Sequence, residues 1–546
     1  MAVAQRIREE IARVFGVPQE EVKLEHPADL KNGDYSTGVA MQFAKRLGKN
    51  PLALADIFVN TGPIDGVEKI EIAGPGFINF YLAANTIADS IKTAQSEDMW
   101  GANENLKSKK IMVEYTDPNP FKEFHIGHLM SNAIGESIAR LSQFSGAEVK
   151  RANYQGDVGP HVAKAIWALA MKKPSLLEIS MAYANGAKAY EENPQAKAEI
   201  DAVNQKIYDK SDPEINESYT YGRNISLQHF EILYRILGTK FDYYFFESET
   251  GPRGVEIVRT HPEVFTISEG ATVFQGEKAG LHTRVFLTSK GLPTYETKEL
   301  GLAEMKEEKW SADVLISVTA HEQADYFKVV LAAMKEVMPE IATKIRHISH
   351  GMMRLPTGKM SSRTGDVITG ESLLKDLIVA AEERAKDSRA TSHHELAEQV
   401  AVAAIKYQIL KQASGKDIIF DRERALSLEG DSGPYLQYAH ARACAVVEKA
   451  REQHIEAKAE SVEPSELARL IHRFPEAVEY AASELEPHLL SNYLLALASA
   501  FNSWYAQVHI LDGSTDAHHK VALTAAVART LKNGLWVLGI STPEKM

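Results

Sequence analysis

The stretch IMVEYTDPNPFKEFHIGHLMSNAIGESIARLSQFSGAEVKRANY at Ile111–Tyr154 decides the fold of the chain. Its first residues, IMVEYT, form a short apolar run that predicts a buried strand. The run from Leu129 to Gly146 carries apolar residues at helical spacing and ends on a glycine, which predicts a helix that stops there. EVKRANY then predicts a second strand. Strand, helix and strand in this order indicate a right-handed unit of a parallel sheet.

Two histidines, His125 and His128, stand three residues apart at the predicted start of this helix. A helix N-terminus attracts phosphate because it carries unpaired N–H groups and a partial positive charge. Both imidazoles would share one face of the first turn and could donate hydrogen bonds to phosphate oxygens. Gly127 leaves room for a flat base. By itself the tetrapeptide also fits an ordinary helix start. A zinc site is disfavoured because no third and fourth ligands are evident, so we expect no protein-bound metal.

A second stretch, LPTGKMSSRTGDV at Leu355–Val367, is polar and basic and follows the strand-like RHISHGMM. Lys359, two serine hydroxyls and Arg363 suit a loop that closes over a transferring phosphate. Such a loop is more often a solvated turn when it occurs alone. Together with the two upstream histidines in a parallel-sheet domain, it is a much more specific indication of nucleotide chemistry.

At 546 residues the chain is long enough for two to four domains. Residues 1–105 read as helices followed by a strand pair around a Gly-Pro-Gly break. Residues 106–370 read as the parallel-sheet domain, with a helical insertion near 171–240 and with ATVFQ, TRVFLTS and DVLISV continuing the sheet. Residues 371–546 are helical. We therefore predict an α/β chain: a Rossmann-type parallel-sheet catalytic domain, an N-terminal α/β accessory domain and a C-terminal all-α helical bundle.

Composition is ordinary for a globular protein, with 44% hydrophobic and 25% charged residues and a formal net charge of −13. The single cysteine, Cys444, rules out a disulfide framework and any multi-cysteine zinc site. No run approaches the length of a membrane span. The N-terminal MAVAQRIREEIARVFG has the pattern of an amphipathic helix and lacks the apolar core of a secretory signal. We expect a cytoplasmic protein with no membrane partner.

HIGH at His125–His128 and KMSSR at Lys359–Arg363 resemble the two nucleotide-binding motifs of class I aminoacyl-tRNA synthetases. The surrounding segments resemble the arginyl-tRNA synthetase family in particular, over essentially the whole chain. The segments that carry this resemblance are GDYSTGVAMQFAKRLGKNP (Gly33–Pro51), IAGPGFINFYL (Ile72–Leu82), NYQGDVG (Asn153–Gly159), FDRERALSLEGDSGPYLQYAHAR (Phe420–Arg442) and LGISTPEKM (Leu538–Met546).

The resemblance implies a two-step ligation of L-arginine to tRNA(Arg). Arginine and ATP, the latter as its Mg²⁺ complex, would give arginyl-adenylate and pyrophosphate, and the arginyl group would then pass to the terminal adenosine of the tRNA. The N-terminal domain would contact the tRNA elbow and the helical domain the anticodon; we expect a monomer. Two alternatives stay open: a catalytically impaired synthetase-like RNA-binding protein, and a nucleotidylyltransferase that uses the same His-x-Gly-His site.

The resemblance also implies roles for particular residues around the nucleotide. His125, His128, Lys122 and Lys359 would be catalytic. ATP would be bound by His125, Gly127, His128, Lys359, Met360, Ser361 and Ser362. The loop departs from the class pattern, because a lysine is usual where Ser362 stands. Lys122, or else Arg363, is expected to supply the missing positive charge.

Arginine selection calls for carboxylates that suit a planar, bidentate guanidinium. By resemblance the arginine-binding residues are Glu114, Asn119, His125, Tyr295, Glu299 and Gln323. Glu299 stands where an aspartate is more usual, and Gln323 is one of several polar residues in the segment Thr319–Phe327 that could fill its role. The residues predicted to contact tRNA are Tyr435, Trp504, Tyr505 and Met546.

Overall fold

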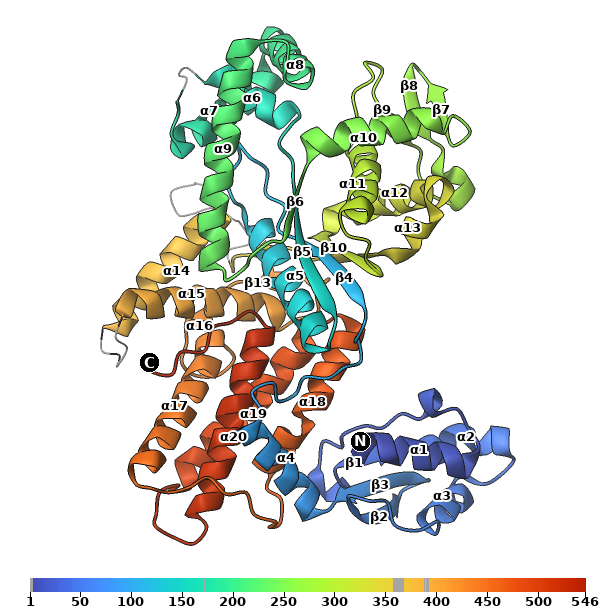
Figure 1. Ribbon diagram of the computed structural model, residues 1–546, viewed down its shortest axis with the longest axis vertical. Coiled ribbons are helices and arrows are strands. Elements are labelled where there is room, and N and C mark those ends of the chain that lie inside the picture. The colour runs from blue at the N-terminus through green and yellow to red at the C-terminus, as the bar shows by residue number, and fades with distance from the viewer. Residues whose placement is uncertain (1–2, 170–172, 357–367, 387, 389–391) are drawn as a thin grey trace. The chain divides into compact units, whose positions relative to one another are not determined.

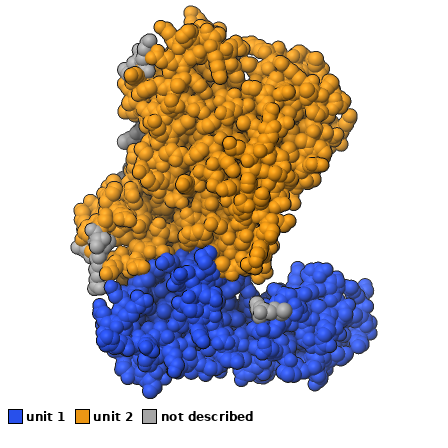
Figure 2. All heavy atoms as spheres, viewed as in Figure 1, with its two compact units in different colours: residues 1–101, 439–476, 495–533 blue, residues 102–438, 477–494, 534–546 orange. Residues whose placement is uncertain are grey.

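The computed structural model of the chain describes residues 3–169, 173–356, 368–386, 388 and 392–546 (Figure 1). Two compact units are each built from three segments of the chain (Figure 2). The smaller unit combines residues 1–101, 439–476 and 495–533, and the larger unit combines residues 102–438, 477–494 and 534–546. The helical C-terminal part of the chain therefore contributes to both units.

A five-stranded parallel sheet in the larger unit confirms the predicted fold class. Its strands are β4 (Lys110–Glu114), β5 (Glu148–Gln155), β6 (Tyr243–Phe246), β10 (Val314–Ala320) and β11 (Ile345–His350). They lie in the order β11–β10–β4–β5–β6, and every neighbouring pair is parallel. The chain adds β5 and β6 on one side of β4 and later β10 and β11 on the other. The direction of the connections therefore reverses between β4 and β10, and ligands of open α/β sheets bind outside the carboxyl ends of strands at such a point.

Helix α5 (Ile126–Phe144) connects β4 to β5, as predicted, and is buried along most of its length. It contacts β4, β5 and β10 of the sheet as well as helices α14 and α15. Gly135 allows the close approach to the sheet, because a Cβ at this position would lie 2.3 Å from atoms of the Tyr115 side chain. Gly146 follows the helix with a φ of +94°, a conformation that favours glycine and stops the helix there.

The segment between β5 and β6 is helical, as the sequence predicts. Its helices are α6 (Pro160–Ala168), α7 (Leu176–Glu192), α8 (Pro194–Asp209) and α9 (Pro213–Ile236). Ser175, Asn193 and Asp212 accept backbone N–H hydrogen bonds at the starts of α7, α8 and α9. The four helices share a hydrophobic core that includes Phe121 from the loop before α5. This core therefore fixes one side of the loop that leads to the two histidines.

The expectation that residues 271–275 and 283–289 continue the parallel sheet is wrong. They form β8 (Ala271–Phe274) and β9 (Arg284–Leu287), which join β7 (Phe265–Ser268) in a separate antiparallel sheet. Parallel neighbours need a crossover of a dozen or more residues, and the connections here are too short for one. Around this sheet lie α10 (Glu247–Thr260), η3 (Gly276–Ala279), α11 (Tyr295–Lys309), η4 (His321–Gln323), α12 (Ala324–Val337) and α13 (Pro339–Lys344). The third predicted strand, DVLISV, is confirmed as β10.

The N-terminal residues form the predicted α/β fold. The elements are α1 (Val3–Phe15), η1 (Gln19–Glu21), η2 (Leu30–Asn32), β1 (Tyr35–Thr37), α2 (Val39–Leu47), α3 (Pro51–Val59), β2 (Val67–Ala73), β3 (Phe77–Leu82) and α4 (Ala84–Ser96). The strands pair antiparallel in the order β1–β3–β2. The Gly-Pro-Gly break is the turn of the β2–β3 hairpin, where Gly74 and Gly76 have φ values of +52° and +127°.

The described residues after the second motif are almost entirely helical, as predicted. The elements are α14 (Gly370–Ala385), α15 (His393–Leu410), β13 (Ile418–Ile419), α16 (Arg422–Ala425), α17 (Gly433–Glu452), α18 (Glu466–Glu484), α19 (Pro487–Gln507) and α20 (Ala517–Val537), and the short strand β12 (Met353–Arg354) precedes the motif. The two short strands β12 and β13 pair with each other. Among the described residues, no helix is both long and apolar enough to cross a membrane.

Within the smaller unit, polar contacts join the N-terminal residues to helices α18 and α20. The Arg469 guanidinium pairs with the buried Asp34 carboxylate, and Glu476 accepts hydrogen bonds from the Tyr35 hydroxyl and lies 3.2 Å from His26 Nε2. The Trp100 indole N–H donates to Thr530 Oγ1 at 3.1 Å. These contacts explain why residues 1–101 and parts of the helical region form one compact unit.

The close approach of α5 to Tyr115 gives a direct test of the packing. We expect Gly135→Ala to lower the free energy of unfolding by about 1–3 kcal/mol, because the added methyl group must displace a buried aromatic side chain. The measurement is urea unfolding followed by circular dichroism. Gly415→Ala is the control, since the nearest atom to a Cβ there is 3.9 Å away. Equal stability of the two variants would contradict the described contact between Gly135 and Tyr115.

Candidate active site

The two histidines form a stacked pair at the N-terminus of α5. Their ring centroids are 3.5 Å apart and the ring planes differ by 23°. The His125 backbone N–H donates to His128 Nδ1 at 3.2 Å, so the second histidine caps the start of its own helix. Phe124 packs beside the pair, with its ring centroid 5.2 Å from that of His128. The helix start therefore has one imidazole, that of His125, that is partly open to solvent and partly shielded from it, and one that is buried beneath it.

This geometry fixes the proton on the buried imidazole. Because His128 Nδ1 accepts a backbone hydrogen bond, the neutral ring carries its proton on Nε2. Burial and the Lys122 ammonium lower the pKa of His125 to about 4. Burial, His125 and Lys122 together lower the pKa of His128 well below its usual range. Both histidines are therefore neutral hydrogen-bond donors at pH 7, beside the positive end of a helix.

Two glycines allow the backbone around His125 to pack closely. A Cβ at Gly127 would lie 3.3 Å from His125 Nδ1, so a side chain there would disturb the stacked rings. A Cβ at Gly370 would lie 2.8 Å from the His125 carbonyl oxygen, and the Glu371 N–H donates to the Phe124 carbonyl at 3.2 Å. The start of α14 is thereby fixed against the histidines. It follows directly on the second motif, whose residues Lys359, Met360, Ser361, Ser362 and Arg363 lie outside the described residues.

The loop between β4 and α5 has an unusual backbone. Thr116, Asp117 and Phe121 have φ values of +80°, +49° and +67°, which non-glycine residues rarely adopt. Buried hydroxyls hold the loop: Ser131 Oγ accepts from the Thr116 N–H and Ser226 Oγ accepts from the Phe121 N–H. Such strain persists only where the surroundings impose it, and it is concentrated at functional sites.

Lys122 lies in the same loop and is half-buried. Its ammonium group lies 5.2 Å from the centroid of the Tyr183 ring. Its positive charge lowers the pKa values of both His125 and His128. The structure therefore brings Lys122 into the electrostatic environment of the histidine pair, where the sequence predicted a cation.

A cluster of acidic side chains lies at the carboxyl end of β4. Glu114 is buried and pairs with the Lys306 ammonium at 2.5 Å. Glu299 accepts a hydrogen bond from the Tyr326 hydroxyl at 3.3 Å, and Asp117 accepts one from the Tyr154 N–H at 2.8 Å.

The three carboxylates interact strongly with one another. Burial and the neighbouring Glu114 carboxylate raise the pKa of Glu299 to about 8, although Lys306 opposes the rise. The same two causes raise the pKa of Asp117 well above its usual range. Among the described residues, the Lys306 ammonium is the cation that acts on all three carboxyl groups, so the cluster is suited to receive a further cation.

Among the described residues, no hydrogen bond joins the other side chains predicted to bind arginine, those of Asn119, Tyr295 and Gln323, to the carboxylate cluster. Asn119 Oδ1 accepts from the Gly156 N–H at 3.1 Å, at the end of the neighbouring strand. Tyr295 is 61% exposed at the start of α11, and the Lys298 ammonium lies 5.4 Å from its ring centroid. Gln323 is exposed in η4, and no described contact joins it to the carboxylates.

Asp117, Lys306 and Tyr326 belong to this cluster although the sequence did not single them out. Asp117 stands beside the predicted Glu114 and Asn119 in the segment EYTDPN, so its proximity was a signal that could have been used. Lys306 and Tyr326 lie far along the chain on α11 and α12. Only the folded structure brings these two side chains to the carboxylates.

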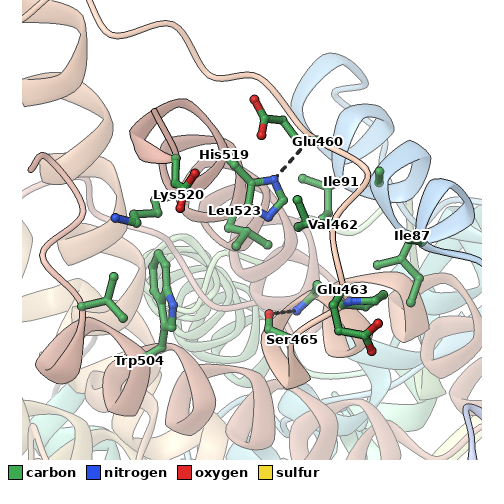
Figure 3. Close-up of a pocket in the computed structure, with 16 residues that line it drawn as sticks. Ile87, Ile91, Glu460, Val462, Glu463, Ser465, Trp504, His519, Lys520 and Leu523 are labelled. Carbon is green, nitrogen blue, oxygen red and sulfur yellow. Dashed lines mark hydrogen bonds between the residues drawn. The ribbon is translucent and has the colours of Figure 1, made fainter. Parts of the chain in front are cut away.

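The four residues predicted to contact tRNA are divided between the two units. Tyr435 and Met546 belong to the larger unit and are half-buried. Trp504 and Tyr505 belong to the smaller unit, where the Arg442 guanidinium lies 4.8 Å from the Tyr505 ring centroid. Trp504 lines a cavity of about 310 Å³ with apolar neighbours that include Ile87, Ile91 and Leu523 (Figure 3). Contact of these four residues with tRNA stays a prediction.

Comparison with known proteins gives a consistent family assignment. Three family models match in order along the chain: "Arginyl tRNA synthetase N terminal domain" over residues 1–82, "tRNA synthetases class I (R), catalytic domain" over residues 90–422, and "DALR anticodon binding domain" over residues 436–546. The second model alone matches more than half of the chain. With the parallel sheet and the histidine pair at its switch point, these matches define a class I aminoacyl-tRNA synthetase.

Individual relatives agree with this class. Arginine–tRNA ligase of Clostridium acetobutylicum is 30% identical over 541 residues, which cover 96% of each chain. The same is true of arginine–tRNA ligase of Limosilactobacillus fermentum over 545 residues. The solved structure of Thermus thermophilus arginyl-tRNA synthetase superimposes with a TM-score of 0.82 at 26% identity and covers 99% of each chain. The chain belongs to the arginyl-tRNA synthetase family.

The protonation state of the histidine pair is directly measurable. In ¹⁵N-histidine NMR spectra we expect His128 to be neutral with its proton on Nε2 at pH 7, and neither His125 nor His128 to titrate between pH 8 and pH 5.5. The reason is the burial and the positive charge that lower both pKa values. His394 is the internal control, since Glu382 raises its pKa. A proton on His128 Nδ1, or titration of either histidine near pH 6.5, would refute the described geometry.

Proposed function

We propose that the site at the carboxyl ends of β4 and β10 activates L-arginine with ATP and then transfers it to tRNA(Arg). A carboxylate oxygen of arginine attacks the α-phosphorus, the bond to the leaving pyrophosphate breaks, and arginyl-adenylate forms. A hydroxyl of the terminal adenosine of the tRNA then attacks the arginyl carbonyl carbon, and AMP leaves. The observation that carries this proposal is the acidic cluster around Glu114, placed in the same loop system as the neutral histidine pair.

The histidine pair would act on the phosphates of ATP. Both rings are neutral at pH 7, so each donates one hydrogen bond without having to lose a proton. Donors fixed by the fold stabilise the charge that develops on the phosphate oxygens without rearranging during the reaction. Gly127 keeps the ring of His125 in place and leaves the approach to the helix start open for adenine.

Positive charge for the pyrophosphate would come from both sides of the nucleotide. Lys122 is half-buried beside the histidines and close enough to lower their pKa values. Lys359, which lies outside the described residues, would act on the pyrophosphate by its resemblance to the second nucleotide-binding motif. Mg²⁺ would enter as part of the ATP substrate.

The carboxylate cluster would bind the arginine side chain. Glu114, Asp117 and Glu299 face one ammonium, that of Lys306, so fully ionised carboxylates leave a formal charge of −2. Arginine brings a guanidinium and an α-ammonium, two positive groups that would balance this charge. A guanidinium donates in one plane to two oxygens at once, which suits neighbouring carboxylates better than a point charge does. Asn119, Tyr295 and Gln323 would complete the pocket.

Two observations argue against the alternative functions. An RNA-binding protein without catalysis has no use for a histidine pair and a strained loop that are built to this geometry. A small nucleotidylyltransferase does not account for the anticodon-binding match over residues 436–546. Contacts of tRNA with Tyr435, Trp504, Tyr505 and Met546, a monomeric state and a cytoplasmic location are further parts of the proposal.

Arginine-dependent ATP–pyrophosphate exchange, assayed with and without tRNA, tests the reaction. We expect exchange with arginine that requires tRNA(Arg), and a decrease of about 10²–10³ in the rate for His125→Ala and for His128→Ala, since each removes one donor to the developing charge. His394→Ala, an exposed histidine on α15, is the matched control. Activation of an amino acid other than arginine would disprove the substrate. Near-normal single-turnover adenylation in both active-site variants would make the histidines structural.

The raised pKa of Glu299 makes arginine binding depend on pH. A protonated carboxyl cannot pair with a guanidinium, so below the pKa of about 8 the binding of arginine must release a proton. We therefore expect the Kd for arginine to fall by up to about tenfold per unit as the pH rises from 6 to 8, and to level off above pH 8.

Equilibrium dialysis with labelled arginine measures this dependence. Glu299→Gln removes this titrating group, so its Kd should be higher and should vary less with pH than that of the wild-type protein; any dependence that is left would come from Asp117, whose pKa is also raised. A Kd of the wild-type protein that is constant between pH 6 and 8 would show that Glu299 does not meet the guanidinium.

A further inference from the structure

Helix α9 of the helical insertion supports the loop that leads to the histidine pair. Four of its residues are spaced so that they share one face of the helix: Gly222, Ser226, His229 and Phe230. The Ser226 hydroxyl accepts from the Phe121 N–H at 3.1 Å, and a Cβ at Gly222 would lie 2.2 Å from the Phe121 ring. This face of α9 therefore packs directly on the strained loop before α5.

The same face of α9 reaches the histidines through Phe230. The Phe230 ring centroid lies 6.2 Å from that of Phe124, and both side chains are buried. Phe124 in turn packs beside His128, with 5.2 Å between the ring centroids. A continuous row of packed rings therefore runs from α9 to the buried histidine.

His229 joins α9 to the start of α14, which passes beside it (Figure 1). Its Nε2 lies 2.7 Å from a carboxylate oxygen of Glu371, and the two side chains are 23% and 20% exposed. The hydrogen bond from His229 lowers the pKa of Glu371 to about 2, with help from Lys375 and against the effect of burial. The carboxylate is therefore ionised at pH 7 and accepts a charge-assisted hydrogen bond from His229.

Glu371 also contacts the loop through its own backbone. Its N–H donates to the carbonyl of Phe124, the residue directly before His125, at 3.2 Å. The preceding residue, Gly370, lies so close that a Cβ there would be 2.8 Å from the His125 carbonyl oxygen. The side chain of Glu371 is thus held by α9, and its backbone holds the residues at the start of α5.

We propose that His229 and Glu371 are positioning residues for adenylate formation, because their hydrogen bond holds the start of α14 against the backbone of Phe124 and His125. The inference rests on the proposed function, since it gives the two side chains a part in that reaction. Both act through the backbone beside His125, without contact to ATP or arginine. Loss of the hydrogen bond would release α14 from α9, and the His125 ring would then be held less firmly where the phosphates bind.

Arginine-dependent ATP–pyrophosphate exchange with saturating tRNA(Arg) tests this role. His229→Leu keeps a side chain of similar size without a donor, whereas His229→Gln retains an N–H near the position of Nε2. We expect His229→Leu to lower kcat by about tenfold, since a misplacement of about 1 Å can cost up to about 10² in rate. The KM for ATP should stay within about twofold, because the lost interaction is one that strengthens in the transition state. His229→Gln should recover most of the rate.

Glu371→Met removes the same hydrogen bond from the other side and gives the test if His229→Leu fails to fold. The double variant should be no slower than the slower single variant, because both changes break one contact. His394→Leu is the matched control. His394 pairs with Glu382 at 2.5 Å, so it makes the same type of contact near the other end of α14, away from His125. Its kcat should equal that of the wild-type protein.

A second readout follows the His125 ring and does not depend on the reaction. In ¹⁵N-histidine NMR spectra, we expect the ring signals of His125 to shift in His229→Leu. They should keep their wild-type positions in His229→Gln and His394→Leu. Unchanged His125 signals in folded His229→Leu would overturn the inference whether or not the protein is active.

The outcomes separate this inference from the proposed function. A wild-type kcat in folded His229→Leu or Glu371→Met overturns the inference, and so does a rate of His229→Gln as low as that of His229→Leu. An equal loss in His394→Leu, additive losses in the double variant, or a loss confined to the KM for ATP would also overturn it. An absence of arginine-dependent exchange by the wild-type protein refutes the proposed function instead, and the NMR spectra then still decide whether the hydrogen bond positions His125.

Discussion

The positions of Glu114, Asp117, Lys122 and the histidine pair depend on how tightly the chain turns from β4 into α5. Only residues 115–125 separate the end of the strand from the start of the helix. To turn within this length, Thr116, Asp117 and Phe121 adopt positive φ values, a conformation that costs free energy and needs support from outside the loop. Ser131 and Ser226 give that support through buried hydrogen bonds. The strain places carboxylates and imidazoles, which bind opposite charges, on one short stretch of chain.

Burial keeps both the histidine pair and the carboxylate cluster close to neutral. The histidine pKa values are lowered and those of Glu299 and Asp117 are raised, in each case chiefly by loss of water. Isolated charges in such a place would be costly. ATP phosphates and the arginine guanidinium would bring the missing charges themselves. Under the proposed function, interactions with these substrates would offset the free energy that burial costs the charged side chains.

The β4–α5–β5 unit, the histidine pair and the N-terminal hairpin could be predicted because their signals are local: an apolar run, a helical repeat and a Gly-Pro-Gly turn. The prediction that β8 and β9 belong to the parallel sheet is wrong, because an apolar run does not show with which strand it pairs. Only the short connections between these strands exclude parallel pairing. Lys306 and Tyr326 were missed for a related reason. Each is an ordinary residue of an amphipathic helix until the fold places it beside Glu114 or Glu299.

Lys306 bears on the choice between arginine and lysine. Its ammonium already pairs with Glu114 at 2.5 Å, so the cluster contains its own compact cation. A substrate lysine would offer a second ammonium of the same shape, which would have to compete for that position or pair with one remaining carboxyl group. A guanidinium has five donors in one plane and can bridge neighbouring carboxylates around the resident ammonium. Under the proposed function, preference for arginine would follow from the shape of the cation, since both substrates carry the same charge.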